Sequence, residues 1–124
     1  MRIFKNKWFA RFAKKESIPD VRLCEAVKEL EAGNIDADYG GGVIKQRIAR
    51  EHAGKSSGYR TVILYRRGDR AFFVYGFPKN VMANIDAGDE KDLKDLSKDL
   101  FAMSDAVFAK MLETGAYLEV ECDA

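Results

Sequence analysis

The central run YRTVILYRRGDRAFFVYGFP, residues 59–78, most strongly limits what this chain can fold into. Two stretches rich in β-branched and aromatic residues, 59–66 and 70–77, are separated by only three residues, Arg67 to Asp69. Two such stretches joined by a short turn that contains glycine are typical of a β-hairpin. Pro78 ends the second stretch, because proline has no N–H to donate to a ladder. The sequence therefore predicts an antiparallel strand pair in the middle of the chain.

Two helical patterns precede this hairpin. Trp8, Phe9 and Phe12 have the spacing of one helical face, which predicts that all three rings face the core. Pro19 suits the first turn of a second helix, where its missing N–H would be unpaired in any case. Gly33 suits the end of that helix, because glycine adopts the left-handed C-cap conformation at little cost. We expect the two helices to form a helical hairpin.

The remaining patterns complete an α+β fold. Strands are expected at residues 2–5 and 43–50, and alternating residues favour a final strand at 117–122. Apolar residues at helical spacing after the acidic segment 86–90 predict one long amphipathic helix that ends near Gly115. We therefore expect a single domain spanning residues 1–124. In it, an N-terminal helical hairpin packs on a mainly antiparallel twisted sheet, with a long C-terminal helix.

Charge is divided unevenly along the chain. Residues 42–80 contain nine basic and two acidic residues, a local charge of +7. Residues 81–124 contain four lysines and eleven acids, a local charge of −7, so the net charge of +1 conceals a strong asymmetry. Aromatic residues interleave with the basic ones in the first of these segments. This combination suits a polyanion that also carries flat bases, namely RNA or DNA.

Several classes of protein are disfavoured. No apolar run approaches the roughly 18 residues that a membrane span needs, and the basic start MRIFKNKWFARFAKK lacks the features of a secretory signal. We expect a cytoplasmic protein without membrane association. Cys24 and Cys122 are far apart and share no CxxC pattern, which predicts two buried apolar cysteines rather than a metal site or a redox pair. His52 is the only histidine, and no metal or cofactor is expected.

Several segments together resemble a known family. The segment KSSGYRTVILYRRGDRAFFVYGFPKN follows a helical hairpin and the basic strand VIKQRIAR. This arrangement resembles the RelE/ParE superfamily of bacterial type II toxins, over almost the whole chain. The opening KNKWFARFAKKE, the run GGGVIKQRIAR and the closing YLEVE are similar to the RelE-like, HigB-type branch.

The resemblance implies a ribosome-dependent endoribonuclease. Such toxins enter the ribosomal A site and cut mRNA by transesterification, in which the ribose 2′-hydroxyl attacks the adjacent phosphorus and expels the 5′-oxygen. The implied partners are the ribosome, mRNA and a cognate antitoxin, which in the HigB-type branch carries a helix-turn-helix domain. Two alternatives remain open from the sequence. One is a ParE-like toxin that poisons gyrase, and the other is a non-catalytic domain that binds antitoxin or RNA.

The chemistry needs cations at the phosphorane and groups that transfer two protons. By the resemblance, Arg60 stabilises the phosphorane, and Lys79 and Lys55 complete the catalytic set. Either lysine would act as the base if neighbouring cations lower its pKa. The predicted RNA-binding residues lie on the basic strand and the hairpin: Lys45, Arg47, Arg50, Tyr59 and Tyr65.

One part of the family pattern is missing. Many relatives have a tyrosine or histidine near the C-terminal end of the fold, whereas the residues after Lys79 read NVMANIDAGDE. Asn84 is a poor proton donor. Substitutes for the missing group remain open: Tyr59, Tyr65, Tyr75 and His52.

Overall fold

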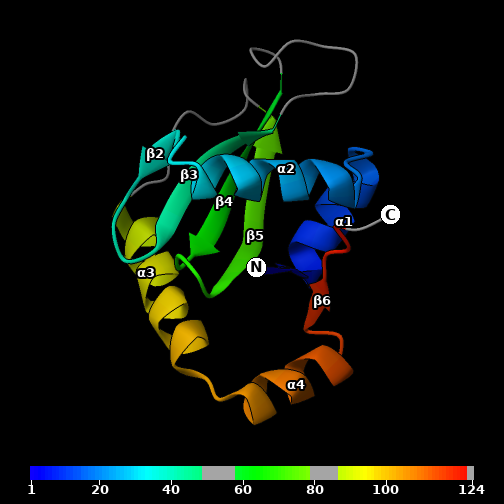
Figure 1. Ribbon diagram of the computed structural model, residues 1–124, viewed down its shortest axis with the longest axis vertical. Helices are drawn as coiled ribbons and strands as arrows, with labels where there is room; N and C mark the ends of the chain where they lie inside the picture. The colour runs from blue at the N-terminus through cyan, green and yellow to red at the C-terminus, as the bar shows by residue number, and fades with distance from the viewer. Residues whose placement is uncertain (49–57, 79–86, 123–124) are drawn as a thin grey trace.

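The computed structural model describes residues 1–48, 58–78 and 87–122. In this part of the chain a six-stranded sheet has the order β2-β3-β4-β5-β1-β6. β1 runs parallel to β5 and all other neighbouring strands are antiparallel. Helices cover both faces of the sheet (Figure 1), so the predicted α+β fold with a mainly antiparallel sheet is confirmed. The elements are β1 (Arg2–Asn6), α1 (Lys7–Lys15), α2 (Asp20–Glu31), β2 (Ala37–Asp38), β3 (Val43–Ile48), β4 (Tyr59–Tyr65), β5 (Arg70–Pro78), α3 (Ala87–Ala102), α4 (Asp105–Glu113) and β6 (Tyr117–Glu119).

The predicted hairpin is formed by β4 and β5. Their register runs from Tyr59 opposite Pro78 to Tyr65 opposite Ala71. Val74 is an extra residue in β5, where the register shifts between Val62 and Ile63 of β4. Such a bulge bends the strand and increases its twist. β5 continues to Pro78, whereas its pairing with β1 stops at Phe73.

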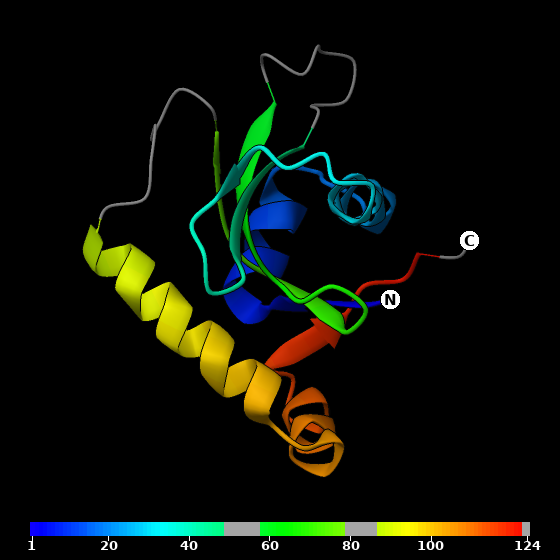
Figure 2. The same cartoon turned by 60° about the vertical axis from the view of Figure 1, so that its left-hand side comes forward.

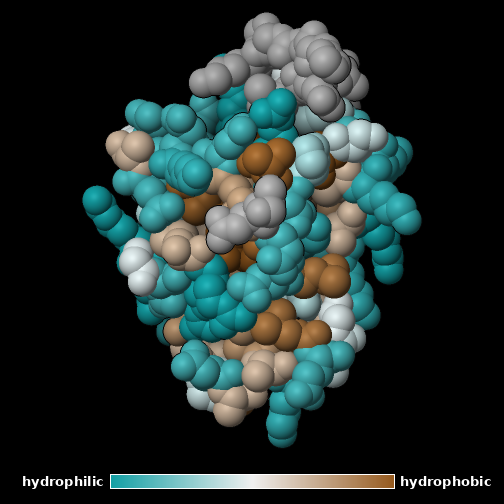
Figure 3. All heavy atoms as spheres, turned by 45° about the vertical axis from the view of Figure 1, so that its right-hand side comes forward, coloured by the Kyte–Doolittle hydropathy of each residue, from teal (hydrophilic) through white to brown (hydrophobic). Residues whose placement is uncertain are grey.

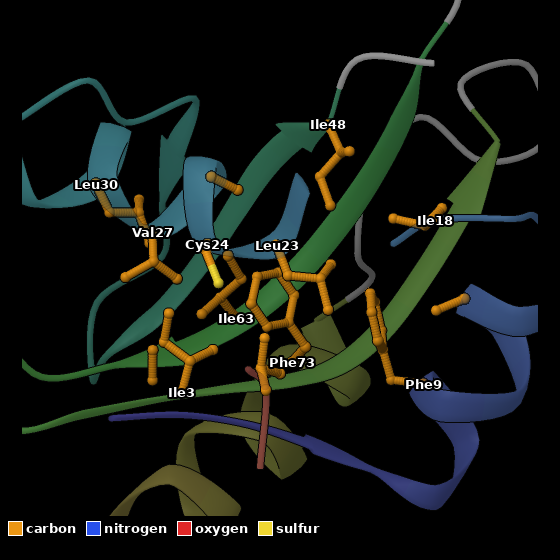
Figure 4. Close-up of a cluster of buried hydrophobic side chains, with 14 of the residues drawn as sticks. Ile3, Phe9, Ile18, Leu23, Cys24, Val27, Leu30, Ile48, Ile63 and Phe73 are labelled. Carbon is orange, nitrogen blue, oxygen red and sulfur yellow. The ribbon is translucent and has the colours of Figure 1, made fainter. Parts of the chain in front are cut away.

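The α1–α2 hairpin packs on one face of the sheet. Phe9 of α1 meets Phe73 of β5 at a centroid distance of 5.1 Å, and Leu23 of α2 is also fully buried (Figure 4). Asn6 caps α1, since its side-chain oxygen accepts a hydrogen bond from Phe9 N at 2.8 Å. Gly33 follows α2 with a positive φ of 89°, as the sequence predicted.

One ring of the predicted apolar stripe is not in the core. Trp8 is 42% exposed, so the expectation that it packs inside was wrong. Helical periodicity places Trp8 next to Phe12, and the Trp8 ring stacks on Phe12 and Tyr75 while much of it stays open to solvent. Figure 3 shows a surface on which hydrophilic residues predominate and apolar side chains emerge in separate patches.

The opposite face of the sheet carries two helices instead of the one long helix predicted. α3 lies across the sheet from α2 (Figure 2), and α4 follows after a break at residues 103–104. The side chain of Ser104 accepts a hydrogen bond from Val107 N at 3.2 Å and starts the new helix. The break turns α4 so that Phe108 packs edge-on against Phe4 at 4.7 Å, whereas Val107 is exposed. No described helix has the length and apolarity required to cross a membrane.

The two cysteines form a disulfide, which corrects the prediction of two separate buried thiols. Cys24 of α2 and Cys122 are joined across 98 positions of sequence, with a Cα–Cα distance of 5.7 Å. The segment after β6 runs beside β1, because Val120 N donates to Ile3 O at 2.8 Å. That course brings Cys122 to the side of α2. Sequence separation alone concealed the pair, since only the sheet order brings the C-terminal segment next to an N-terminal helix.

Gly42 illustrates how tightly the loop before β3 fits the rest of the fold. Its φ is +83°, and an added Cβ would lie 2.9 Å from both the Ser97 hydroxyl and the Tyr65 carbonyl oxygen. We expect Gly42→Ala to lower the free energy of unfolding by more than the roughly 1–2 kcal/mol of the left-handed conformation alone. Gly68→Ala is the matched control, because Gly68 also has positive φ (+75°) but open space around it. Urea denaturation that gave equal losses for the two variants would contradict the predicted steric conflict.

Candidate functional site

Two arginines from neighbouring strands form the centre of the candidate site. Arg47 of β3 and Arg60 of β4 are directly opposite each other in the antiparallel ladder. Directly opposite residues project from the same face of a sheet with Cβ atoms about 4.5–5.5 Å apart. Two arginines are therefore held side by side by backbone pairing.

Both guanidiniums are directed at one carboxylate. Arg47 Nη2 lies 3.7 Å from Asp36 Oδ1, and Arg60 Nε lies 3.7 Å from Asp36 Oδ2. These distances are ion-pair distances and exceed the range of a hydrogen bond. The side chain of Arg60 is only 11% exposed, whereas that of Arg47 is 40% exposed. Arg60 Nη1 is buried and has no hydrogen-bond partner among the described residues, and a buried donor in that state is unusual in a folded protein.

Asp36 is held in place by a buried polar network. Its backbone N–H donates to Gln46 Oε1 at 3.0 Å, and Gln46 Nε2 donates to the carbonyl oxygen of Asn34 at 2.9 Å. Thr61, which pairs with Gln46 in the ladder, donates its hydroxyl to the Gln46 carbonyl at 2.8 Å. Gln46 and Thr61 are both buried. The acid therefore has a defined position beside the arginines.

Sequence analysis did not select Asp36 or Gln46 as site residues. One signal was present for Gln46: a polar residue interrupts the Ile44 and Ile48 face of β3. A buried amide at such a position is expected to have hydrogen-bond partners. No comparable signal marked Asp36, because its role depends on the edge strand β2 that only the fold places beside β3.

The other cationic residues of the prediction divide into two groups. Lys45 lies two residues before Arg47 in β3, so alternation puts it on the same face of the sheet. Lys45 also has an interaction within the structure. The predicted residues Arg50, Lys55 and Lys79 lie outside the described residues. Their convergence with Arg60 remains a prediction.

Of the two tyrosines predicted to contact RNA, Tyr59 belongs to the core and Tyr65 is partly buried against it. Tyr59 is only 4% exposed, and its ring meets Phe12 edge-on at 5.8 Å on the face covered by α1 and α2. Tyr65 also packs against that cluster, and its buried hydroxyl has no hydrogen-bond partner within the described residues. Burial of Tyr59 leaves its ring no exposed face for a base, whereas Tyr65 is partly exposed. Strand alternation explains the correction, since Tyr59 points away from the side that carries Arg60.

The arginines of the hairpin turn have structural partners. Arg70 Nε is 3.1 Å from Asp69 Oδ1, and the Arg70 guanidinium lies 5.2 Å from the Phe108 ring centroid. Arg66 lies over Phe101 at 4.8 Å. Cation–π contacts of this kind fasten the turn to α3 and α4. A hollow of about 570 Å³ adjoins Arg66, between the 41–42 loop and α3.

A comparison with models of known protein families shows to which family this chain belongs. The family described as the RelE toxin of the RelE / RelB toxin-antitoxin system matches residues 1–120. The chain is a member of the RelE toxin family. This RelE-family toxin consequently has a cognate antitoxin as its partner. A search of curated proteins found no match, and the HigB-type branch stays a prediction.

Proposed function

We propose that this RelE-family toxin is a metal-independent endoribonuclease that cuts mRNA on the ribosome and thereby inhibits translation. The observation that carries the proposal is the pair Arg47 and Arg60, whose guanidiniums converge on one carboxylate-sized position. A phosphate is an anion of similar size, and guanidinium donors form the planar fork that suits its oxygens. We also propose a helix-turn-helix domain in the antitoxin, on the resemblance of the opening, the GGGVIKQRIAR run and the closing YLEVE to the HigB-type branch.

The proposed step is a transesterification. The ribose 2′-oxygen forms a bond to phosphorus as the bond from phosphorus to the 5′-oxygen breaks, leaving a 2′,3′-cyclic phosphate and a 5′-hydroxyl. One proton leaves the 2′-hydroxyl and another is delivered to the 5′-oxygen. Negative charge accumulates on the non-bridging oxygens in the transition state, where preorganised donors act most strongly. Arg60 has the lower exposure and an unpartnered Nη1, which supports giving it this role.

The flanking cations have separate proposed roles. Arg47 is the more exposed of the pair, and with Lys45 and Arg50 it binds neighbouring phosphates. Lys55 and Lys79 are the proposed proton-transfer residues. Asp36 orients the two guanidiniums in the free toxin, and its 3.7 Å separations leave both forks able to turn toward a phosphate.

The test is to follow transcripts and DNA topology in parallel after the toxin is induced. Cleavage would be mapped by primer extension on translated mRNA, and gyrase activity would be measured by plasmid supercoiling. We expect cuts within translated regions and unchanged supercoiling. Loss of supercoiling without mRNA cuts would identify a ParE-like gyrase poison. The absence of both effects would leave a non-catalytic domain that binds antitoxin or RNA.

We expect RNA binding to depend steeply on salt. Each phosphate that is neutralised on a single strand contributes about 0.7 to the slope of log K against log salt. Arg47→Ala should therefore flatten the slope by about 0.7, as measured by fluorescence anisotropy between low and physiological salt. Arg67→Ala removes an exposed arginine of the β4–β5 turn and should leave the slope unchanged. Equal slopes in all three proteins would exclude Arg47 as a phosphate ligand.

A further inference from the structure

A row of aromatic rings from α1 and the end of β5 reaches the surface. Trp8 stacks on Tyr75 with 4.5 Å between centroids and on Phe12 with 5.4 Å, and Tyr75 continues to Phe77 at 6.0 Å. Trp8 is 42% exposed and Tyr75 is 36% exposed, whereas Phe77 is buried. Burying these rings would stabilise the fold. Neighbouring aromatic rings that stay open to solvent therefore indicate a surface that binds another molecule.

Hydrogen bonds of Asn6 hold the aromatic row in place. Asn6 Nδ2 donates to Val74 O at 3.1 Å, while the Asn6 side-chain oxygen caps α1. One side chain thus ties the start of α1, next to Trp8, to the residue before Tyr75. A platform fixed in this way loses little conformational entropy when a ligand binds to it.

Strand register connects the row to the site. Phe77 is directly opposite Arg60, and Tyr75 lies two residues earlier in β5. Residues two apart in a strand share a face, and diagonal neighbours across a strand pair lie about 7–8 Å apart. Tyr75 is therefore a diagonal neighbour of Arg60, on the face that also carries Arg47. Tyr75 therefore brings the end of the aromatic row to the face of the sheet that carries the arginines, while Trp8 and Phe12 belong to the α1 side.

The charge around Trp8 favours a nucleic acid as the occupant. Arg11, Phe12 and Lys15 are the helical neighbours of Trp8 at three, four and seven residues. α1 contains no acidic residue, and its basic residues are all exposed: Lys7, Arg11, Lys14 and Lys15. Aromatic faces interleaved with cations match the stacking platforms and electrostatic grooves of proteins that bind single strands. A protein partner would more often meet a wider apolar patch with fewer charges.

We propose that Trp8 and Tyr75 form a base-stacking platform for single-stranded RNA, next to the phosphate held by Arg47 and Arg60. The proposal rests on the proposed function for the position of the RNA, and it adds the chemical class of the contact beyond the scissile link. Stacking tolerates any base, because every base has a π-face. The platform therefore contributes affinity and orientation rather than base choice.

Trp8 is the only tryptophan of the chain, so its fluorescence reports directly on the platform. The probe is a short 2′-O-methyl oligoribonucleotide, which lacks the attacking hydroxyl and cannot be cut. We expect saturable quenching of Trp8 emission by this probe and none by an abasic strand or by polyphosphate at equal charge. Tyr75→Ala and Trp8→Ala should each weaken binding about 10-fold, the usual scale for one stacked base. Trp8→Phe should restore most of the loss, because it keeps an aromatic face.

The controls separate this inference from the nuclease proposal. Val21→Ala removes an exposed apolar side chain of α2, away from the row, and should bind RNA as the unmodified protein does. Normal mRNA cleavage without quenching by the oligonucleotide would overturn the platform and leave the nuclease intact. Quenching without any mRNA cleavage would support the platform and contradict the nuclease proposal. Quenching by the abasic strand equal to that by RNA, or loss of antitoxin binding alone in Trp8→Ala, would replace base stacking by simple charge attraction or by a protein contact.

Discussion

Arg60→Ala is expected to lower the single-turnover rate of mRNA cleavage on the ribosome by about 100- to 1,000-fold, the usual cost of removing one preorganised donor from a developing oxyanion. The effect should be large because Arg60 is mostly enclosed, and its Nη1 has no partner within the described part of the chain. Water cannot readily replace a donor in such a position. Quenched-flow measurement on programmed ribosomes, with the toxin in excess, would give the rate of the chemical step.

Two further variants sharpen this prediction. Arg60→Lys keeps the positive charge but loses the planar fork, so it should retain only part of the rate. Arg67→Ala removes an arginine of the exposed turn and should cut mRNA at the normal rate. Circular dichroism melts would verify that each variant is folded. A folded Arg60→Ala protein with an unchanged cleavage rate would remove Arg60 from the catalytic set.

Cys122→Ala is expected to lower the free energy of unfolding by about 2–4 kcal/mol, because a disulfide that spans a long loop restricts the unfolded chain. The bond closes a loop across 98 positions of sequence. Cys122 is the better residue to change, since Cys122 is an exposed residue whereas Cys24 is buried in the core. Urea denaturation, followed by circular dichroism, would measure the loss.

Reductant provides the matched comparison. The unmodified protein in dithiothreitol should unfold at the same urea concentration as Cys122→Ala, and Cys122→Ala should not respond to reductant. Disulfides are uncommon in the reducing cytoplasm, so the added stability is present only where the bond is oxidised. Equal stability of the unmodified protein with and without dithiothreitol would show that the bond does not constrain the unfolded chain.

Local patterns predicted most of the secondary structure, because each depends on residues that are close in sequence. Alternation and the RRGD turn indicated the β4–β5 hairpin, and Gly33 marked the end of α2 through its own backbone chemistry. The C-terminal helix pattern failed at Ser104. Apolar spacing continued through the break there, and the capping side chain was the better signal.

The candidate site was partly predictable for a similar reason. Arg47 and Arg60 lie on strands that alternation could orient, and their meeting needed only the antiparallel pairing of β3 with β4. Tyr59 lies one residue from Arg60, but side chains alternate along β4, so the Tyr59 ring lies in the core. Trp8 and Tyr75 were each assigned to other roles, because their stacking crosses from α1 to the end of β5.

By itself, the sequence determined the hairpin, the helical hairpin, the charge asymmetry and the resemblance to RelE-family toxins. Periodicity, turn chemistry and composition are local properties that need no knowledge of the fold. Only the tertiary structure decided that Asp36 faces two arginines, that Cys24 bonds to Cys122 and that Trp8 lies on Tyr75. Each of these contacts joins separate elements, and strand order and register, which no local pattern encodes, set which elements become neighbours.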